Sequence, residues 1–254
     1  MRIIISPAKQ MREDLDTLAP QNLPIFLREA KQLLSALRAL SPKERQKLWN
    51  CNDSIAALNN SRLQTMDLQH GLTPALLSYV GIQYQTMAPG VLEVQQYAFL
   101  QEHLRILSGF YGLLRPFDGV TPYRLEMQAK LAVDGASDLY AFWGDRLAHT
   151  LSAEAEWILD LASKEYSRAV LPHLPPSLRV VTCIFGELRA DGKVVEKGTL
   201  CKMARGQMVR WLAEQQITSP NELPRFDALG YRYDKARSHE NRLVFLKSAS
   251  HPIP

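Results

Sequence analysis

Residues 2–9, RIIISPAK, join a short apolar run to a turn that contains a proline and a lysine. The run Arg2–Ile5 is typical of a short buried strand, and the turn ends it. Ser6 and Lys9 directly follow this strand, where a hydroxyl and an ammonium can bind the oxygens of a small anion. The alternative is an ordinary Ser-Pro turn. The stretch therefore predicts a strand and a candidate binding position.

The rest of the 254-residue chain alternates strands and helices irregularly. The spacing of apolar residues predicts helices over 22–40, 42–49, a segment capped by Asp53, the first part of 91–107, 137–152 and 199–215. Strands are expected at 79–87, the end of 91–107, 157–163, 178–185 and 242–248, with an Asp-Gly hairpin at 188–195. Because no regular βαβ rhythm emerges, we expect an α+β or irregular α/β fold, with residues 1–254 forming a single compact domain.

The net charge of +4 is unevenly distributed. Residues 1–50 carry nine Lys/Arg against five Asp/Glu, residues 198–247 again nine against five, and residues 51–197 twelve against sixteen. If the two basic ends meet in space, they form a positive face suited to an anionic partner. Alternatively, these cations only solvate two helices.

Several classes of protein lack support in this sequence. Its apolar runs are too short to span a bilayer, so no membrane association is expected. The start of the chain lacks the form of a secretory signal, and three cysteines without CxxC spacing fit free thiols in a reducing cytoplasm. The histidines show no paired metal spacing, and phosphate-loop, dinucleotide and serine-hydrolase signatures are missing. We therefore expect no cofactor and no metal.

Residues 107–127, LSGFYGLLRPFDGVTPYRLEM, place two arginines in rigid turns. Arg115 and Arg124 each adjoin proline or glycine. A fixed guanidinium can bind two oxygens of a phosphate at once. The alternative is internal pairing that only supports the loop, for example of Arg124 with Glu126 or Glu165.

Two later segments supply further polar side chains. The segment KMARG places Lys202 and Arg205 three residues apart on a helix, and we expect both to face away from its apolar stripe. Gly206 is unfavourable inside a helix and could let another backbone or a phosphate approach closely. A solvated helix face is the alternative. The segment LASKEY supplies Ser163, Glu165 and Tyr166, where the carboxylate is either a base or structural.

Taken in order, ISPAK, the 107–127 block, LASKEY, KMARG, and GY followed by LVF resemble the bacterial YaaA family of peroxide-stress-response proteins. The resemblance spans nearly the whole chain. It implies a cytoplasmic protein with one α/β domain, a mixed sheet surrounded by helices, and a basic cleft that binds duplex and distorted DNA. Two positions depart from the family pattern: Asp160 stands where asparagine is expected, and Arg242 where a glutamate usually precedes Leu-Val-Phe.

The resemblance also implies site residues and a DNA-binding element. The DNA- or anion-binding positions are Ser6, Lys9, Arg115, Tyr123, Arg124, Lys202, Arg205 and Gly206; the cleft-lining positions are Glu126, Ser163, Glu165 and Tyr166. The candidate helix-hairpin-helix comprises residues 42–49, a turn over 50–53 and residues 54–66. That turn lacks the glycines usual for such elements.

Three functions follow as hypotheses. The first is a DNA-binding, stress-protective protein without sequence specificity, acting as a monomer. The second is an enzyme acting on a nucleotide or nucleic acid in the same cleft. The third, an iron-handling protein, would need a ligand cluster that the sequence does not display. We expect six side chains to lie on one concave surface: Ser6, Lys9, Arg115, Arg124, Lys202 and Arg205.

Overall fold

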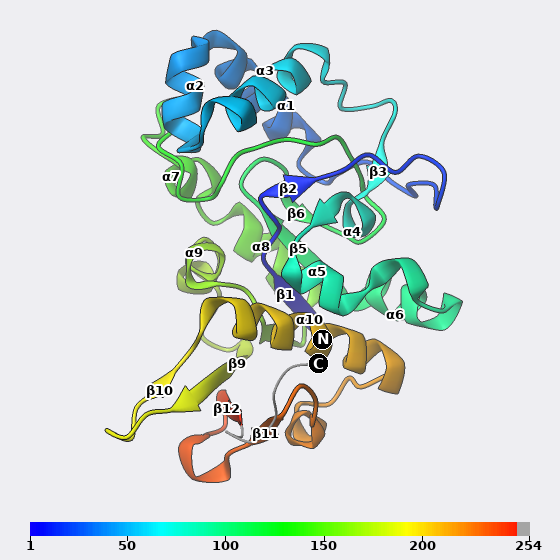
Figure 1. Cartoon of the computed structure of the whole chain (residues 1–254), viewed down its shortest axis with the longest axis vertical. Helices are drawn as coiled ribbons and strands as arrows, with labels where there is room; N and C mark the ends of the chain where they lie inside the picture. The colour runs from blue at the N-terminus through cyan, green and yellow to red at the C-terminus, as the bar shows by residue number, and fades with distance from the viewer. Residues whose placement is uncertain (248–254) are drawn as a thin grey trace.

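A central mixed sheet organises the protein, as seen in a computed structural model that describes residues 1–247 (Figure 1). Within these residues the sheet has eight strands in the order β11-β12-β9-β8-β1-β5-β6, with β10 beside β9. The strands are β1 (Arg2–Ile5), β5 (Leu104–Ser108), β6 (Gly112–Leu114), β8 (Trp157–Asp160), β9 (Arg179–Leu188), β10 (Val194–Val195), β11 (Tyr231–Tyr233) and β12 (Arg242–Lys247). Two small ribbons pair β2 (Gln10–Met11) with β4 (Tyr79–Val80) and β3 (Thr73–Pro74) with β7 (Gly119–Val120).

The centre of the sheet is parallel. Strand β1 lies between β5 and β8, with Ile3 opposite Leu104 on one side and Leu159 on the other. From β1 the chain proceeds to β5 on one side, then returns to β8 on the other and continues outward through β9 and β12. The direction of winding therefore reverses between β1 and β8. In open α/β sheets, ligands bind outside the carboxyl ends of the strands at such a reversal.

Helices pack around this sheet. They are α1 (Leu27–Ala39), α2 (Pro42–Trp49), α3 (Asp53–Thr65), α4 (Ala75–Ser78), α5 (Ile82–Met87), α6 (Val94–His103), α7 (Leu139–Trp143), α8 (Arg146–Glu154), α9 (Lys164–Ser167) and α10 (Gly198–Gln215). Short 3-10 turns are η1 (Pro89–Val91), η2 (Leu171–His173), η3 (Pro220–Arg225) and η4 (Lys235–Arg237). Helix α10 packs against α5, α6 and β9, while α1, α2 and α3 lie together at one end of the molecule (Figure 1).

The expected α+β fold with a mixed sheet in one domain is confirmed. Strands β1, β8, β9 and β12, the hairpin β9–β10 and helices α2 and α10 lie where the sequence predicts them. Ser41 forms a capping box with Glu44 at the start of α2. The basic cleft is not established by the fold and stays a prediction.

Four local predictions are wrong. Residues 79–87 form only the short strand β4 and then α5, because Gln83, Tyr84 and Met87 are buried at helical spacing. The helix over 137–152 breaks at Gly144, whose left-handed backbone (φ 52°) ends α7. Asn52 caps α3 in place of Asp53. The first helix begins at Leu27, several residues after the proline at 24.

Candidate functional site

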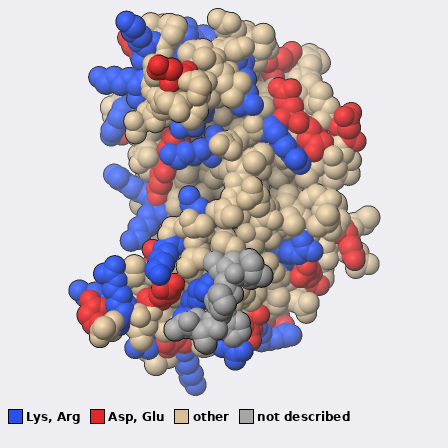
Figure 2. All heavy atoms as spheres, in the orientation of Figure 1, with Lys and Arg blue, Asp and Glu red and all other residues tan. Residues whose placement is uncertain are grey.

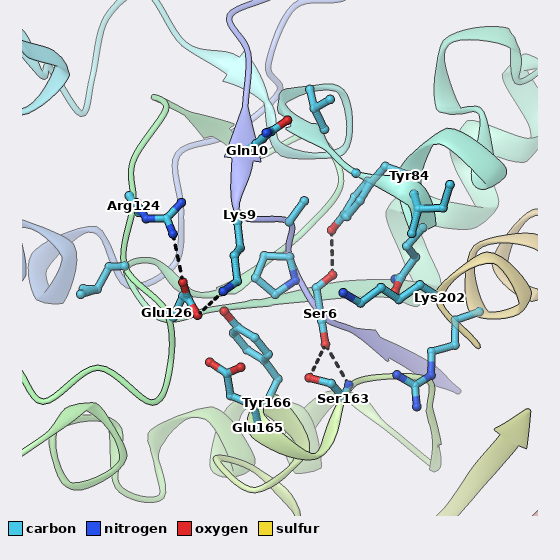
Figure 3. A pocket seen from close by; sticks show the side chains of 18 of the residues that line it. Ser6, Lys9, Gln10, Tyr84, Arg124, Glu126, Ser163, Glu165, Tyr166 and Lys202 are labelled. Carbon is cyan, nitrogen blue, oxygen red and sulfur yellow. Dashed lines mark hydrogen bonds and ion pairs between the residues drawn. The ribbon is translucent and has the colours of Figure 1, made fainter. Parts of the chain in front are cut away.

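A polar pocket of about 350 Å³ lies at the carboxyl ends of β1 and β8, where the winding of the sheet reverses (Figure 3). Residues 6–10 after β1 form one wall. Residues 80–84, 123–126 and three residues at the start of α9 form others, and α10 contributes Lys202 and Arg205. The pocket therefore collects segments from both ends and the middle of the chain.

Two serines join the strand ends. Ser6 follows β1 and donates its hydroxyl to Ser163 Oγ at 3.1 Å, while the Ser163 backbone N–H donates to Ser6 Oγ at 2.8 Å. The hydroxyl of Tyr84 donates to the Ser6 carbonyl at 3.0 Å. These bonds fix the floor of the pocket without a charged group.

The turn that carries Ser163 is held by Asp160, the last residue of β8. Its carboxylate accepts the Ala162 backbone N–H at 2.9 Å and the Ser167 hydroxyl at 2.8 Å. Burial raises the pKa of Asp160, and these hydrogen bonds together with the charge of Arg205 lower it in part. Both hydrogen bonds end on Oδ1, an acceptor that asparagine also has, so the departure from asparagine adds a negative charge beneath the pocket and near Arg205.

An ion-pair chain crosses one side of the pocket. Lys9 Nζ lies 2.9 Å from one carboxylate oxygen of Glu126, and Arg124 Nη2 lies 3.5 Å from the other (Figure 3). Arg124 also donates to the carbonyl of Trp49 at 3.4 Å, which ties the pocket to α2. Internal pairing of Arg124 with Glu126 was one of the two alternatives for this arginine, and it is present.

Glu165 and Tyr166 form the base of the same side. Burial raises the pKa of Glu165, and the nearby charge of Glu126 raises it further. The Gln128 backbone N–H, which donates to Glu165 at 3.2 Å, and Lys9 lower that pKa in part. Burial also raises the pKa of Tyr166 well above its usual range. The pocket thus holds a carboxyl group that retains its proton to higher pH than an exposed glutamate.

Tyr123 lines the pocket, but its hydroxyl is used in the core. That hydroxyl lies 2.8 Å from the hydroxyl of Tyr79 and 2.6 Å from Ser108 Oγ. Burial raises the pKa of Tyr123. Its ring therefore contributes shape to the pocket, and its polar group is occupied.

Helix α10 reaches the pocket because Gly206 lets the backbone of α5 approach closely. A β-carbon at Gly206 would lie 2.1 Å from the backbone oxygen of Gln83 in α5. Of the two reasons considered for Gly206, close approach of another backbone is the one the structure shows. This contact brings Lys202, one turn before Gly206, and Arg205, directly before it, to the pocket.

The expected orientation of the two α10 cations is only half right. Lys202 is exposed, and Figure 3 shows its side chain directed toward Ser6. Arg205 is largely buried and pairs with Glu196 at 3.2 Å. The cause is that β9 and the segment before α10, which carries Glu196, cover this side of the helix, and a single amphipathic stripe does not reveal this.

Unpaired donors surround the pocket. Within residues 1–247, five buried side-chain nitrogen atoms lack a hydrogen-bond partner, and three of them belong to pocket residues: Gln83 Nε2, Arg124 Nε and Arg205 Nε. A fourth, Trp49 Nε1, belongs to an adjoining cavity of about 850 Å³ that shares Lys9 and Glu126 with the pocket. Since native proteins leave few buried donors unpaired, each such group calls for a physical explanation.

The structure brings together ten of the twelve predicted site residues. They are Ser6, Lys9, Tyr123, Arg124, Glu126, Ser163, Glu165, Tyr166, Lys202 and Arg205. Gly206 supports the pocket from behind. The prediction that Arg115 shares the concave surface is wrong. Asp118 captures this arginine by accepting its backbone N–H at 2.8 Å and pairing with its guanidinium at 2.8 Å.

Sequence reasoning missed the wall formed by residues 80–84. Gly81, Gln83 and Tyr84 were assigned to a strand, so neither the unpaired amide of Gln83 nor the Tyr84 hydroxyl entered the candidate site. The helical spacing of buried residues in IQYQTM was the available signal. Residues 1–247 contain no cluster of three or more His, Cys, Asp or Glu side chains placed to hold a metal ion.

The fold and pocket define a single-domain α+β protein with a candidate ligand site at the carboxyl ends of its central parallel strands. The chain belongs to the peroxide stress protein YaaA family, whose sequence model matches residues 1–237. The resemblance seen in the motifs is thus confirmed. Family membership supports a role in the peroxide stress response.

Several curated relatives cover nearly the full length. A UPF0246 protein of Lachnoclostridium phytofermentans is 52% identical over 250 residues, which is 98% of each chain. UPF0246 proteins of Desulfitobacterium hafniense and Pediococcus pentosaceus are 51% and 47% identical, over 98% and 99% of this chain and 98% and 100% of theirs. In the described part of the chain, no helix is both long and apolar enough to cross a bilayer. The cytoplasmic location and the monomeric state stay predictions.

Proposed function

We propose that this protein serves the peroxide stress response by binding DNA through its phosphate backbone, without strong sequence specificity. One observation carries the proposal: exposed cations gather beside the pocket. Figure 2 shows Lys and Arg side chains along much of the left margin, the side on which Figure 1 places α2, α9 and β10. We call the exposed cations of these segments the cationic margin: Lys43, Lys47, Lys164, Arg168, Arg189, Lys193 and Lys197.

The cationic margin has few exposed carboxylates. In the segments 42–49, 164–168 and 187–197, only Glu44 and Asp191 are exposed acids. Helix α9 contains the margin residue Lys164 and the pocket residues Glu165 and Tyr166, and Arg168 follows at its end. The margin and the pocket therefore adjoin. Phosphate contacts of this kind position a duplex and carry no base information.

The helix pair α2–α3 is part of this proposal. The two helices lie where the candidate helix-hairpin-helix was expected, and they pack against each other. Asn50 adopts the left-handed conformation (φ 43°) that glycine usually supplies in such turns. The pair places Lys43 and Lys47 on the margin, as a backbone-binding element requires.

Fluorescence anisotropy of labelled duplexes tests the proposal. Two duplexes of unlike sequence are titrated at several salt concentrations. We expect similar affinities for both and a log–log slope of about −0.9 for each phosphate contacted. The double variant Lys164→Ala/Lys193→Ala reduces that slope by up to about 1.8, whereas Lys31→Ala, on the exposed side of α1, leaves it unchanged. Flat anisotropy at low salt would refute DNA binding.

A second candidate, an enzyme acting on a nucleotide or nucleic acid in the pocket, is favoured by Glu165. A carboxyl group with a raised pKa in a pocket is suited to general acid–base catalysis. Chromatography of nucleotides and end-labelled DNA after incubation would detect conversion. Turnover that Glu165→Gln removes while binding persists would support the enzyme.

A further inference from the structure

At the end of the pocket formed by Lys202 and Arg205, which we call the donor end, the positive charge exceeds the negative charge of the neighbouring carboxylates. Ion pairs account for Lys9, Arg124 and Arg205, whereas Lys202 enters none among residues 1–247. Its ammonium nevertheless extends toward Ser6 instead of away from the molecule (Figure 3). Arg205 donates a hydrogen bond from Nη2 to Glu196, and its buried Nε–H has no partner.

A neutral donor joins these cations. Gln83 is only 7% exposed, lines the pocket, and has no partner for its amide nitrogen. Because Gly206 lets α5 lie directly against α10, the backbone positions of Gln83, Lys202 and Arg205 are fixed relative to one another. A ligand with several acceptor oxygens would satisfy donors that are otherwise buried without partners. A phosphate group, with three terminal oxygens and a charge of −1.5 to −2 at neutral pH, fits this set better than a carboxylate.

The opposite end of the pocket carries two carboxyl groups, of which Glu126 pairs with Lys9 and Arg124. In Figure 3 Ser6 lies between Lys202 on one side and Glu126 and Glu165 on the other. The two carboxyl groups accept hydrogen bonds from hydroxyl or amino groups, the donors that a sugar or a base carries. A ligand that is anionic at one end and rich in such donors at the other matches both halves of the pocket.

The size of the pocket limits the ligand. About 350 Å³ is near the lower end of the range for small-molecule sites, enough for one mononucleotide and too small for a duplex. The cationic margin lies outside this volume, so duplex binding and pocket occupation are separate events.

We propose that the pocket binds one nucleoside monophosphate unit, with its phosphate beside Lys202, Arg205 and Gln83 and its sugar or base donors toward Glu126 and Glu165. The unit is a free nucleotide or the 5′-phosphorylated end of a DNA strand, which share a phosphate monoester on a nucleoside. This inference deepens the proposed function and rests on it for the class of ligand.

Calorimetric titration with the four common nucleoside 5′-monophosphates, the matching nucleosides and inorganic phosphate tests the site. At least one monophosphate is expected to bind, at least about tenfold more tightly than its nucleoside. Lys202→Ala weakens this binding about ten- to hundredfold and leaves the nucleoside affinity within about twofold. The matched control Lys31→Ala changes neither. Equal affinities for monophosphate and nucleoside, or wild-type binding by Lys202→Ala, would overturn the inference.

A second arm identifies the source of the phosphate. Single strands with a 5′-phosphate or a 5′-hydroxyl are titrated by anisotropy in the presence of the free monophosphates. A preference for the phosphorylated strand that the free nucleotide removes shows that both occupy the pocket; no preference assigns the pocket to the free nucleotide. Failure of both monophosphates and phosphorylated strands to bind would refute the site.

Blunt duplexes with 5′-hydroxyl ends, measured in the same series, test the proposed function by itself. Duplex binding without nucleotide binding would remove this inference and keep the proposed function. Nucleotide binding without duplex binding would keep this inference and refute the proposed duplex binding.

Discussion

Arg115 and Arg124 stand nine residues apart in the same rigid segment, yet their surroundings differ. Arg115 pairs with Asp118, which is fully buried, and its backbone N–H is bound by the same carboxylate. Arg124 has a side chain only 9% exposed, a longer contact of 3.5 Å to Glu126, and a buried Nε–H without a partner. The first arginine serves the fold, and the second belongs to the pocket.

The difference shows how structural and ligand-binding cations can be separated in this molecule. A short ion pair with a buried carboxylate that also accepts a backbone N–H of the same turn, as between Arg115 and Asp118, indicates that the arginine stabilises the turn. Unpaired buried donors beside a cavity indicate a group whose partner is a ligand. The same criterion places Arg205 and Gln83 with Arg124.

The largest effect is expected at Gly206, where fold and pocket cannot be separated. In Gly206→Ala the new β-carbon would meet the Gln83 backbone oxygen, so α10 must move away from α5. We expect a loss of at least about 3 kcal/mol in the free energy of unfolding, together with loss of ligand binding.

Gly198→Ala is the matched control on the same helix. A β-carbon there meets nothing within 4 Å, so stability should be unchanged or slightly higher. Urea denaturation of both variants measures the difference. Equal stabilities would show that the α5–α10 contact does not position the pocket.

Arg115→Ala should reduce stability and spare binding. Removing the guanidinium leaves the buried carboxylate of Asp118 unpaired, at a cost of about 3 kcal/mol at neutral pH. The deficit should shrink in acid, because a protonated Asp118 needs no cation. Thermal melting across pH measures it, and nucleotide titration below the melting temperature should match the wild type. A loss of binding in the folded variant would contradict the separation of the two arginines.

Arg124→Ala should reduce nucleotide binding more than stability, the opposite of Arg115→Ala. Glu126 keeps its 2.9 Å contact with Lys9, so no carboxylate is left alone, and the stability loss should be smaller than in Arg115→Ala. Nucleotide affinity should fall about three- to tenfold, because Glu126, which faces the sugar or base, loses its contact with Arg124. Calorimetry and melting on both variants, side by side, give the comparison. Reversed magnitudes would show that Arg124 is the structural member of the pair.

Local patterns predict much of the fold and part of the site. RIIISPAK correctly predicts β1 and a polar turn, and the Ser41–Glu44 box fixes the start of α2, because both depend on residues close in sequence. Arg115 was wrongly predicted to lie on the concave surface, although its partner Asp118 is only three residues away. The neighbouring proline and glycine indicate a rigid turn, but they do not indicate which carboxylate pairs with the arginine. The α5–α10 contact joins Gln83 to Gly206, which lie 123 residues apart in the sequence, and no single-sequence pattern reports such a distant contact.

The smallest effect is expected at Glu165, and its sign follows from the pKa. Burial raises the folded-state pKa of Glu165 above its unfolded value, so the folded state holds this proton more tightly. The resulting stabilisation is fully present below the unfolded pKa and is lost as pH rises through the folded one. At neutral pH the ionised, partly buried carboxylate therefore weakens the fold.

Glu165→Gln removes this charge and keeps an oxygen that can accept the Gln128 N–H. We expect the variant to be more stable than the wild type at neutral pH by less than about 1 kcal/mol, a bound that allows for solvent screening of a half-exposed group. The two proteins should converge below about pH 4, where the wild-type carboxyl is neutral in both states. Glu13→Gln, on an exposed residue, should show no such trend. If the stability gap instead widened toward acid, the surroundings would stabilise the Glu165 carboxylate, and its folded-state pKa would be lowered instead of raised.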